Sequence, residues 1–366
     1  MTGAPILEIE DLRTYFFARS KQAFIRAVDG VDLRINRGET LGLVGESGSG
    51  KSITALSIMG LISAEPGVIS GRMGFKTDGL QVNLLRGIKE YVHLARKDGR
   101  VMEVRKNCPG WEKQVERLMG AIRGKEISVI FQNPRSSLNP FIPIGKQITE
   151  AILLKGRIKN RREAKQRALY WLEQVKIDSP RLRFDSYPYG LSGGMCQRAM
   201  VAMALASEPS LLIADEPTTG LDATIQSKIV DLLQELKSAF TVTTMLISHD
   251  IAVIRRLSDS AAVMYGGMLM ECGPADHILH VDHESKHPYT AALLASIPSE
   301  KHIKEKAYLQ AIEGDVLDTI NTPDGCRFYA RCNRVTEGIR EKCRYHEPDL
   351  REISPGHCVR CWLYFD

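Results

Sequence analysis

Short apolar segments separated by longer amphipathic stretches dominate the pattern of this chain. The apolar segments occupy residues 40–44, 127–131, 211–214, 242–247 and 261–265. Runs of this length are typical of strands buried in a sheet, whereas apolar residues spaced by three and four between residues 145 and 175 predict helices in a separate lobe. Strands alternating with helices predict an α/β protein.

An antiparallel sheet is expected at the start of the chain. Apolar and polar residues alternate from Ile6 to Ile35, and Asp29-Gly30 supplies a turn signal. After a predicted helix at residues 53–59, Glu65-Pro66-Gly67 breaks the helical pattern and an extended pattern resumes. Residues 261–271 predict a closing hairpin, at which we expect the sheet to end.

The charged stretch from Lys76 to Arg123 is expected to be helical. Its apolar residues fall at helix-like intervals: Leu84, Leu85, Ile88, Val92 and Leu94. One or two amphipathic surface helices fit this spacing, and a solvated face is favoured over a partner-binding role for the charges. Cys108-Pro109-Gly110 is expected to be a loop with a structural or incidental cysteine.

The composition is that of an ordinary globular protein. Its 366 residues, 43% hydrophobic and 25% charged, allow one large domain and a smaller one. The net charge of +5 is scattered along the chain, which gives nucleic acid binding little support. We expect no secretory signal, and no run approaches the roughly 20 apolar residues that cross a bilayer, so any membrane association is expected to be peripheral.

One stretch carries a phosphate-binding motif. The residues Gly45-Glu46-Ser47-Gly48-Ser49-Gly50-Lys51-Ser52 fit the pattern G-x-x-x-x-G-K-[ST]. They lie between a predicted strand and a predicted helix, the context in which such a loop wraps the phosphates of a nucleotide. In that geometry the glycines allow close backbone approach, Lys51 reaches the β and γ phosphates, and the Ser52 hydroxyl ligates Mg²⁺.

Polar side chains follow three other predicted strands. Gln132 can contact Mg²⁺ or the attacking water, although a lone glutamine is more often a surface residue. Asp215 and Glu216 are adjacent carboxylates, which are costly at a strand end unless a cation or a reaction requires them. Asp215 can hold Mg²⁺, and Glu216 can accept a proton from the water that attacks the γ phosphate. For His249, sensing of the γ phosphate is favoured over a structural role.

Two further segments are candidates for nucleotide contacts. Ser192 is suited to cap a helix whose first N–H groups, from Gly193 to Met195, suit an anion. Tyr15-Phe16-Phe17 lies about thirty residues before the phosphate loop, where a ring could stack on adenine, and packing in the core is an equal alternative for each ring.

Taken in order, these motifs resemble the nucleotide-binding subunit of ABC transporters. The resemblance is carried by Gly45 to Ser52, Gln132, Leu191 to Gly194, Leu211 to Glu216, Gly220-Leu221-Asp222 and His249. It implies a P-loop ATPase core with a mixed sheet, an antiparallel β subdomain and a helical subdomain at about residues 134–195. It also implies that Ser192, Gly193 and Gly194 contact the nucleotide of an opposite subunit. Asp222 would lie in a loop that communicates across the dimer, and Phe16 would stack on the base.

A narrower resemblance is to the ATPases of dipeptide and oligopeptide importers. It is carried by Ala27 to Val31, Leu43 to Ser52, Phe131 to Pro134, Ser137 to Pro140, His287 to Thr290 and Cys326 to Cys332. It implies a nucleotide-binding domain over residues 1–285 and a C-terminal extension over residues 286–366. Cys196 and Gly220 replace the basic residue and the alanine usual in the family, and an insertion at about residues 76–123 exceeds the subfamily norm.

Five of the eight cysteines lie in the tail, at Cys326, Cys332, Cys343, Cys358 and Cys361. Four converging thiolates could hold a [4Fe–4S] cluster or a zinc ion. The resemblance favours the cluster, on Cys326, Cys332, Cys343 and Cys361, with Cys358 as the spare or alternative ligand. Reduced cysteines packed in a small domain are the other interpretation.

The expected function is ATP binding and hydrolysis with Mg²⁺ at a dimer interface, which powers import of a peptide or a related small solute. The resemblance implies four partners: a second ABC ATPase subunit that is a paralogue, two membrane permeases and an extracytoplasmic solute-binding protein. It implies a place on the cytoplasmic face of the cell membrane. The alternative is an ABC ATPase that acts on ribosomes or DNA, against which stand a single phosphate loop and the lack of sustained heptads. A third possibility makes the cysteine tail a redox regulator.

Overall fold

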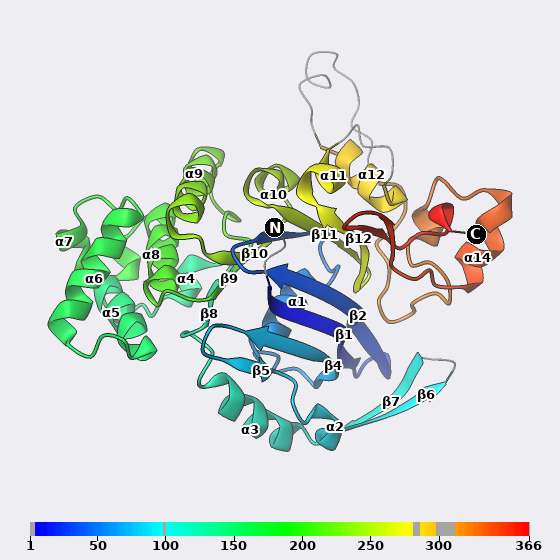
Figure 1. The fold of residues 1–366 in the computed structure, drawn as a ribbon, viewed down its shortest axis with the longest axis horizontal. Coiled ribbons are helices and arrows are strands. Elements are labelled where there is room, and N and C mark those ends of the chain that lie inside the picture. Colours follow the sequence, from blue (N-terminus) through cyan, green and yellow to red (C-terminus); the bar gives the residue numbers. More distant parts are fainter. Residues whose placement is uncertain (1–3, 98–99, 281–285, 298–311, 366) are drawn as a thin grey trace, which may run out of the picture. The chain divides into compact units, whose positions relative to one another are not determined.

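The computed structural model describes residues 4–97, 100–280, 286–297 and 312–365. The chain divides into two compact units, and Figure 1 labels many of their strands and helices. The phosphate-loop unit comprises Leu7–Arg34, Leu41–Val115 and Ser248–Asp366. The helical unit comprises Met1–Ile6, Ile35–Thr40 and Glu116–Ile247.

A four-stranded sheet with the order β2-β1-β4-β5 lies mostly in the phosphate-loop unit. Its strands are β1 (Pro5–Ala18), β2 (Ala23–Asn36), β4 (Pro66–Lys76) and β5 (Gln81–Asn83). Strands β1 and β4 pair antiparallel, from Leu7 opposite Phe75 to Phe16 opposite Pro66. The alternating pattern buries one set of side chains, including Leu7 and Phe75. The antiparallel sheet expected from the sequence is therefore confirmed.

A second sheet in the same unit is mixed. Strand β3 (Thr40–Val44) is buried at every position and lies parallel to β11 (Ser260–Tyr265), and β12 (Met268–Pro274) returns antiparallel to β11. The expectation that the sheet ends at this hairpin is wrong. Strand β14 (His357–Val359) pairs with β12, and β13 (Arg351–Ser354) pairs with β14. The tail thus covers an edge of β12 whose N–H and C=O groups would otherwise need water.

Helices complete the phosphate-loop unit. They are α1 (Lys51–Ile58), α10 (Ile251–Leu257), α11 (Ala275–Leu279), α12 (Pro288–Ala295), α14 (Glu337–Tyr345) and the short 3₁₀ turns η2 (Tyr329–Arg331) and η3 (Trp362–Tyr364). The last four belong to the C-terminal region, which contains both regular helix and strand.

The insertion matches the expected helices only in part. It contains a short helix α2 (Ile88–Tyr91), an antiparallel hairpin of β6 (Val92–Lys97) and β7 (Arg100–Lys106), and a longer helix α3 (Cys108–Met119). The hairpin forms because it has a surface to pack on: Lys106 Nζ donates to the backbone carbonyls of Pro66 and Val68 on β4. Cys108 begins α3 and does not lie in a loop.

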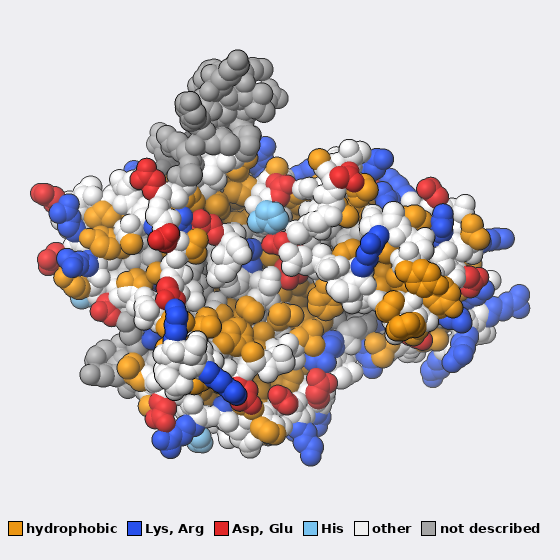
Figure 2. All heavy atoms as spheres, turned by 180° about the vertical axis from the view of Figure 1, so that it is seen from behind, with side chains coloured by type: hydrophobic (Ala, Val, Ile, Leu, Met, Phe, Trp, Pro, Cys, Tyr) orange, Lys and Arg blue, Asp and Glu red, His pale blue; other side chains and the backbone are white. Residues whose placement is uncertain are grey.

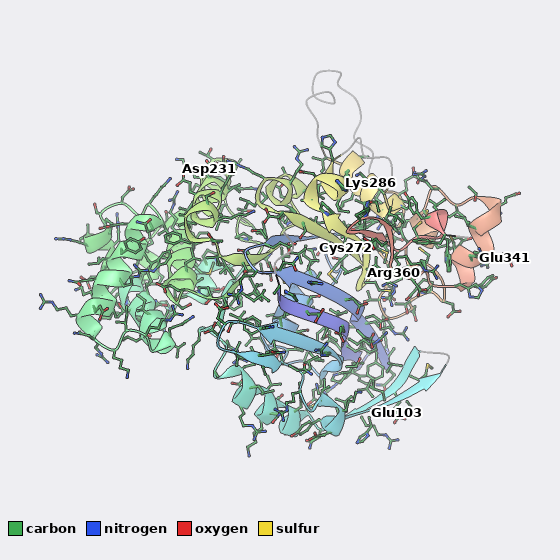
Figure 3. All side chains as sticks on the ribbon, viewed as in Figure 1. Glu103, Asp231, Cys272, Lys286, Glu341 and Arg360 are labelled. Carbon is green, nitrogen blue, oxygen red and sulfur yellow. The ribbon has the colours of Figure 1, made fainter. Side chains whose placement is uncertain are left out.

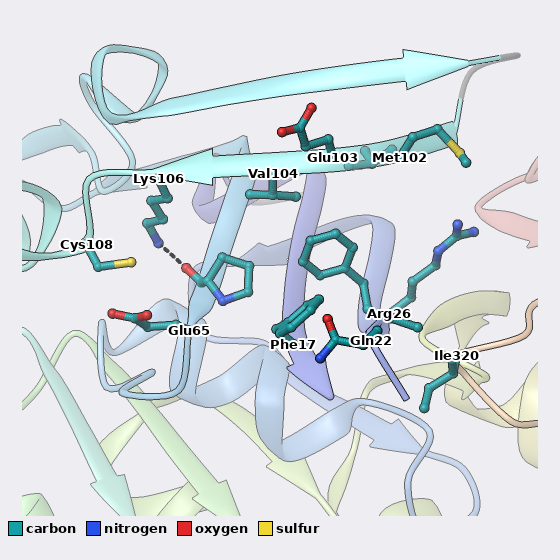
Figure 4. Close-up of a pocket in the computed structure, with 14 residues that line it drawn as sticks. Phe17, Gln22, Arg26, Glu65, Met102, Glu103, Val104, Lys106, Cys108 and Ile320 are labelled. Atoms are coloured by element: carbon teal, nitrogen blue, oxygen red, sulfur yellow. Dashed lines mark hydrogen bonds between the residues drawn. The ribbon is translucent and has the colours of Figure 1, made fainter. Parts of the chain in front are cut away.

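The hairpin also lines a cavity of about 660 Å³ with β1 and β2 (Figure 4). The rings of Phe17 and Phe24 meet edge to face there, with centroids 5.4 Å apart. Figure 4 shows Lys106 pointing to the Pro66 carbonyl at one end of this space. The insertion therefore adds a pocket wall to the phosphate-loop unit.

The helical unit is built on three parallel strands, β8 (Ile127–Ile130), β9 (Leu211–Asp215) and β10 (Thr243–Ile247), with β9 in the middle. Its helices are α4 (Pro134–Ser137), α5 (Ile144–Lys155), α6 (Arg161–Gln174), α7 (Pro180–Phe184), η1 (Pro188–Gly190), α8 (Gly193–Ala206) and α9 (Ala223–Phe240). Helices α5, α6 and α8 gather in a lobe (Figure 1) around buried Ile148, Ala168 and Leu172. The α/β class and the helical segments read from residues 145–175 are confirmed.

One face of the molecule is mixed in charge. Figure 2 shows Lys and Arg side chains interspersed with Asp and Glu on the face in view. Within the described ranges, no helix combines the length and the apolar character that a membrane span requires.

Candidate functional site

The phosphate loop joins β3 to α1, as the sequence predicts. Gly50 precedes α1 with a φ of 106°, in the left-handed region. A Cβ on Gly50 would lie 2.4 Å from the Ala27 carbonyl oxygen, and one on Gly45 would lie 2.2 Å from that of Met264. Only glycine fits at these two positions. The loop is therefore a cradle of backbone N–H groups at a helix N-terminus, the arrangement that binds phosphates.

Lys51 is held against this loop. Its side chain is 5% exposed, and its Nζ donates to the carbonyl oxygens of Gly45 at 2.8 Å and of Glu46 at 2.9 Å. Ser52 is half-buried in the first turn of α1. The loop thus keeps a cation and a hydroxyl beside the N–H groups, which is the donor set that a Mg²⁺-bound triphosphate requires.

The structure separates the three consecutive aromatic rings. Tyr15 is 1% exposed and its hydroxyl donates to the Asp29 carboxylate, so it belongs to the core. Phe17 packs against Phe24 in the cavity described above. Phe16 is half-buried on β1. Of the three rings, Phe16 alone is neither buried in the core nor in that cavity, and the base-stacking role that the resemblance implies stays a prediction.

His249 is exposed just beyond β10. The preceding Ser248 N–H donates to the Leu43 carbonyl of β3 at 3.4 Å. Asp250 accepts hydrogen bonds from the first N–H groups of α10 and so fixes the start of that helix. His249 therefore lies next to the strand that leads into the phosphate loop, and phosphate sensing stays a prediction.

Within the helical unit, Gln132 and Glu216 meet. Asp215 ends β9, and Glu216 follows with a φ of 48°, its N–H donating to the Ile247 carbonyl at 2.9 Å. Gln132 Nε2 donates to Glu216 Oε2 at 2.9 Å, and Thr219 Oγ1 donates to the same oxygen at 2.8 Å. These two donors on one oxygen hold the Glu216 carboxylate in one orientation.

Thr219 was missed in the sequence interpretation. Its signal is its spacing of three residues from Glu216, across a turn that begins with Glu216 and has Pro217 at its second position. A hydroxyl at that distance in a tight turn reaches back to the side chain that opens the turn.

The glycine-containing turn before α8 has the predicted form. The Ser192 hydroxyl accepts from the Met195 N–H at 3.3 Å and caps the helix. Asp222 caps α9 in the same way, accepting from the Ile225 N–H at 3.0 Å. A Cβ on Gly194 would lie 2.9 Å from Ile225 Cγ2, so the glycine lets the starts of α8 and α9 approach closely.

Gln197 is a second residue that the sequence interpretation missed. It is 1% exposed on α8, and its Nε2 donates to the Pro217 carbonyl at 2.6 Å. Pro217 directly follows Glu216, so this bond ties the glycine-containing turn to the carboxylate loop. An amide among the alanine, valine and methionine residues of α8 was the available signal, because a buried amide needs a partner.

The four tail cysteines proposed as ligands, Cys326, Cys332, Cys343 and Cys361, lie in one region. Burial, together with a smaller effect of the neighbouring thiols, raises the pKa of the Cys326 and Cys361 thiols to about 12. Within the described part of the chain, no three His, Cys, Asp or Glu side chains are grouped so that they could hold a metal ion. The expected [4Fe–4S] cluster, and the zinc alternative, are therefore not supported.

Cys358 has a neighbouring thiol outside the four proposed ligands. It lies directly opposite Cys272 across the antiparallel pair of β14 and β12, and Figure 3 marks Cys272. A hydrogen bond with Cys272 lowers the pKa of the Cys358 thiol to about 7, and the same bond raises that of Cys272. These two thiols form a pair separate from the other four.

Comparison with known proteins identifies the family. Residues 28–219 match the family model described as ABC transporter. The chain belongs to the ABC transporter family. Residues 270–338 match the model of the oligopeptide/dipeptide transporter C-terminal region.

The match to individual relatives spans nearly the whole chain. The chain is 41% identical over 359 residues to the oligopeptide transport ATP-binding protein AppD of Bacillus subtilis (strain 168), covering 98% of this chain and 97% of that protein. It is 39% identical over 362 residues to the dipeptide transport ATP-binding protein DppD of Escherichia coli (strain K12), covering 99% and 97%.

Solved structures show the same fold. The ATP-binding cassette MJ0796, in a dimeric post-hydrolysis state bound to ADP and Pi, gives a TM-score of 0.55 at 23% identity, covering 74% of this chain and 98% of that chain. The ABC cassette fold and the ATP hydrolase activity expected from the motifs are thus confirmed.

Proposed function

We propose that this ABC ATPase powers the import of a dipeptide, an oligopeptide or a related small solute through partner membrane permeases. The observation that carries the proposal is the length of the match: it includes the C-terminal region and covers 97% of a relative described as an oligopeptide transport protein. The relatives' names specify peptides, and the class of solute proposed for this chain is taken from that likeness.

ATP binds with its phosphates in the loop from Gly45 to Ser52, along Gly48, Ser49 and Gly50, and with its base on Phe16. The glycine cradle and the buried Lys51 ammonium support this assignment, because they offer donors without side chains in the way. Ser52, Gln132 and Asp215 would hold Mg²⁺, which neutralises charge on the phosphates. All three offer the oxygen ligands that this cation prefers.

Hydrolysis is an in-line attack of water on the γ phosphorus. Glu216 takes the proton of the water as the new P–O bond forms, and the bond to the bridging oxygen of ADP breaks. The hydrogen bonds from Gln132 and Thr219 hold the carboxylate in one orientation, which supports this role. His249 senses the γ phosphate.

The site is completed by a second ATPase subunit, a paralogue of this chain. Ser192, Gly193 and Gly194 donate to the nucleotide of that subunit, and Asp222 communicates across the pair. Two permeases and an extracytoplasmic solute-binding protein complete the importer, with this chain on the cytoplasmic face of the membrane. The helix-capping roles of Ser192 and Asp222 support these assignments, because they fix the two loops.

Glu216→Gln tests the chemistry. The amide oxygen of glutamine can accept the bonds from Gln132 and Thr219, so the loop geometry is kept while the base is lost. We expect ATP to bind as in the wild type and hydrolysis to fall by about 10²–10⁴-fold, the usual contribution of a general base. Glu235→Gln, on the exposed face of α9, is the matched control. Hydrolysis by Glu216→Gln at the wild-type rate would remove Glu216 as the base.

Reconstitution tests the transport role. The full complex in vesicles should hydrolyse ATP faster when peptide-loaded binding protein is added, and should accumulate labelled peptide. Copurification with ribosomes in place of membrane proteins would instead favour the soluble alternative.

A metal centre on Cys326, Cys332, Cys343 and Cys361 belongs to this proposal as a separate question. The effect of these thiols on one another's pKa places them near each other, which supports a metal centre. Against it, no three side chains of the described residues are grouped so that they could hold a metal ion. Iron, sulfide and zinc analysis of the anaerobically purified full chain decides it. Metal that disappears in Cys326→Ser would establish the centre, and metal-free wild-type protein would leave four packed thiols.

A further inference from the structure

The C-terminal region contacts the phosphate loop through Glu46. The Arg331 guanidinium, on η2, donates from Nη1 to Glu46 Oε2 at 2.7 Å and from Nη2 to Glu46 Oε1 at 3.1 Å. This two-pronged geometry is the strong form of the arginine–carboxylate pair. Both residues lie in the phosphate-loop unit, although 285 positions separate them in the sequence.

The backbone of the same loop residue is held by a second group. The Glu46 N–H donates to the Tyr289 hydroxyl at 2.8 Å. Tyr289 is fully buried on α12, and its N–H donates to the His287 ring, which caps the start of that helix. Glu46 is therefore fixed at its side chain by Arg331 and at its main chain by Tyr289, and both partners come from residues beyond the β11–β12 hairpin.

The Arg331 side chain is itself well fixed. It is 5% exposed, against 22% for the Glu46 side chain, and its Nε donates to the Glu313 carbonyl at 3.0 Å. Its guanidinium lies 5.7 Å from the Tyr265 ring centroid. The hydrogen bond with Glu46 raises the pKa of Arg331 above its usual value. Because the guanidinium is buried and already oriented, the Arg331 side chain loses little further conformational entropy when it holds Glu46.

A neighbouring arginine holds the other side of the loop. Arg327 donates from Nη1 to the Gly266 carbonyl in the β11–β12 turn. The adjacent Gly267 N–H donates to the Ser49 carbonyl at 3.0 Å. The tail thus supports the phosphate loop directly at Glu46 and, through the turn, at Ser49.

We propose that Arg331 and Tyr289 are positioning residues for the phosphate loop, and that the affinity of this ATPase for ATP depends on them. Fixing both ends of Glu46 orders the loop before the nucleotide arrives, so less conformational entropy is lost on binding. The inference rests on the ATP-binding activity of the family and not on the solute. The C-terminal region is by this account part of the nucleotide site.

The test measures Mg²⁺–ATP binding to the full chain by calorimetry. Arg331→Ala should raise the Kd for ATP about tenfold, equivalent to about 1.4 kcal/mol, the order expected for lost hydrogen bonds to a charged group. Arg331→Lys keeps the positive charge but loses the two-pronged contact with Glu46, so its Kd for ATP should lie between those of the wild type and Arg331→Ala. Glu46→Gln combined with Arg331→Ala should cost no more than Arg331→Ala alone, because both changes break one contact.

Arg340→Ala is the matched control, since it removes an exposed guanidinium from the same region. It should leave the Kd unchanged. In the assembled complex, Arg331→Ala should raise the KM for ATP while kcat stays within about twofold, because uniform binding is lost. A purely structural role would instead lower the melting temperature and leave Kd alone.

Tyr289→Phe keeps the shape of the side chain and decides the matter should Arg331→Ala fail to fold. It should weaken ATP binding about fivefold, because the Glu46 N–H loses its acceptor. Wild-type Kd in both Tyr289→Phe and Arg331→Lys would overturn the proposal. If the wild-type complex bound ATP normally but imported no peptide, the proposed function would be refuted and this inference would still stand.

Discussion

Arg327→Met removes one arm of the buried network around Asp29. Asp29 on β2 is 4% exposed, and its carboxylate accepts from Arg13, from the Tyr15 hydroxyl at 2.5 Å and from Arg327. Burial alone would raise the pKa of Asp29, but the charges of Arg327 and Arg13 outweigh it and lower that pKa below its usual value. The carboxylate is therefore ionised at neutral pH and needs its donors.

The expected cost follows from what remains after the substitution. Removing one member of a buried ion pair costs about 3–5 kcal/mol when the partner charge is left unpaired. Asp29 keeps Arg13 and Tyr15, whereas the Gly266 carbonyl loses its Arg327 donor. We therefore expect the low end, about 3 kcal/mol, which corresponds to a melting temperature lower by about 6–12 °C for a domain of this size.

Thermal unfolding of the nucleotide-free full chain, followed by circular dichroism, measures this effect. Arg340→Met on the exposed face of α14 is the control and should change stability by no more than about 0.5 kcal/mol. Asp29→Asn combined with Arg327→Met should cost less than the sum of the two single changes. A melting temperature for Arg327→Met equal to that of the control would refute the claim that the tail arginine stabilises the core carboxylate.

Gly50→Ala should abolish ATP binding in the same calorimetric assay, because the new Cβ would lie 2.4 Å from the Ala27 carbonyl at a φ of 106°. In Gly48→Ala the new Cβ would meet nothing within 4 Å, so ATP binding should persist, at a cost of about 1–2 kcal/mol for the left-handed backbone. Equal losses of ATP binding in the two variants would contradict the steric argument. Alkylation by iodoacetamide should rise with pH through a midpoint near 7 at Cys358, the pKa to which its hydrogen bond lowers that thiol. Cys326, with a pKa raised to about 12, should stay largely unlabelled at neutral pH, and peptide mass spectrometry that finds Cys326 labelled first would contradict this order.

The sequence predicted the elements that depend on neighbouring residues. The strand, loop and helix around Gly45 to Ser52 were read correctly because each apolar run and each glycine acts within a few positions. The charged insertion was misread because the apolar residues from Leu84 to Leu94 fit helical spacing, while the contact of Lys106 with β4 selects a hairpin. The tail strands β13 and β14 were missed because three or four residues carry too little periodicity to be recognised alone.

The residues of the candidate site likewise divide into those that the sequence identified and those that only the structure revealed. The residues with motif signals, such as Lys51 and Glu216, could be named from the sequence with their chemistry. Thr219 and Gln197 could not be named from the sequence, because their roles depend on the acceptors that they reach in the folded structure and not on their residue type. The four tail cysteines were predicted as metal ligands from the sequence, yet the described side chains form no group that could hold a metal ion, and such grouping is a tertiary property.

By itself the sequence determined the phosphate-binding loop, since eight consecutive residues prescribe the backbone angles and the N–H groups that a nucleotide needs. Only the tertiary structure decided that Arg331 reaches Glu46 and that Arg327 reaches Asp29, across 285 and 298 positions. The physical reason is that such pairs form only after the chain has folded back on itself, and their stability comes from the burial that this folding creates.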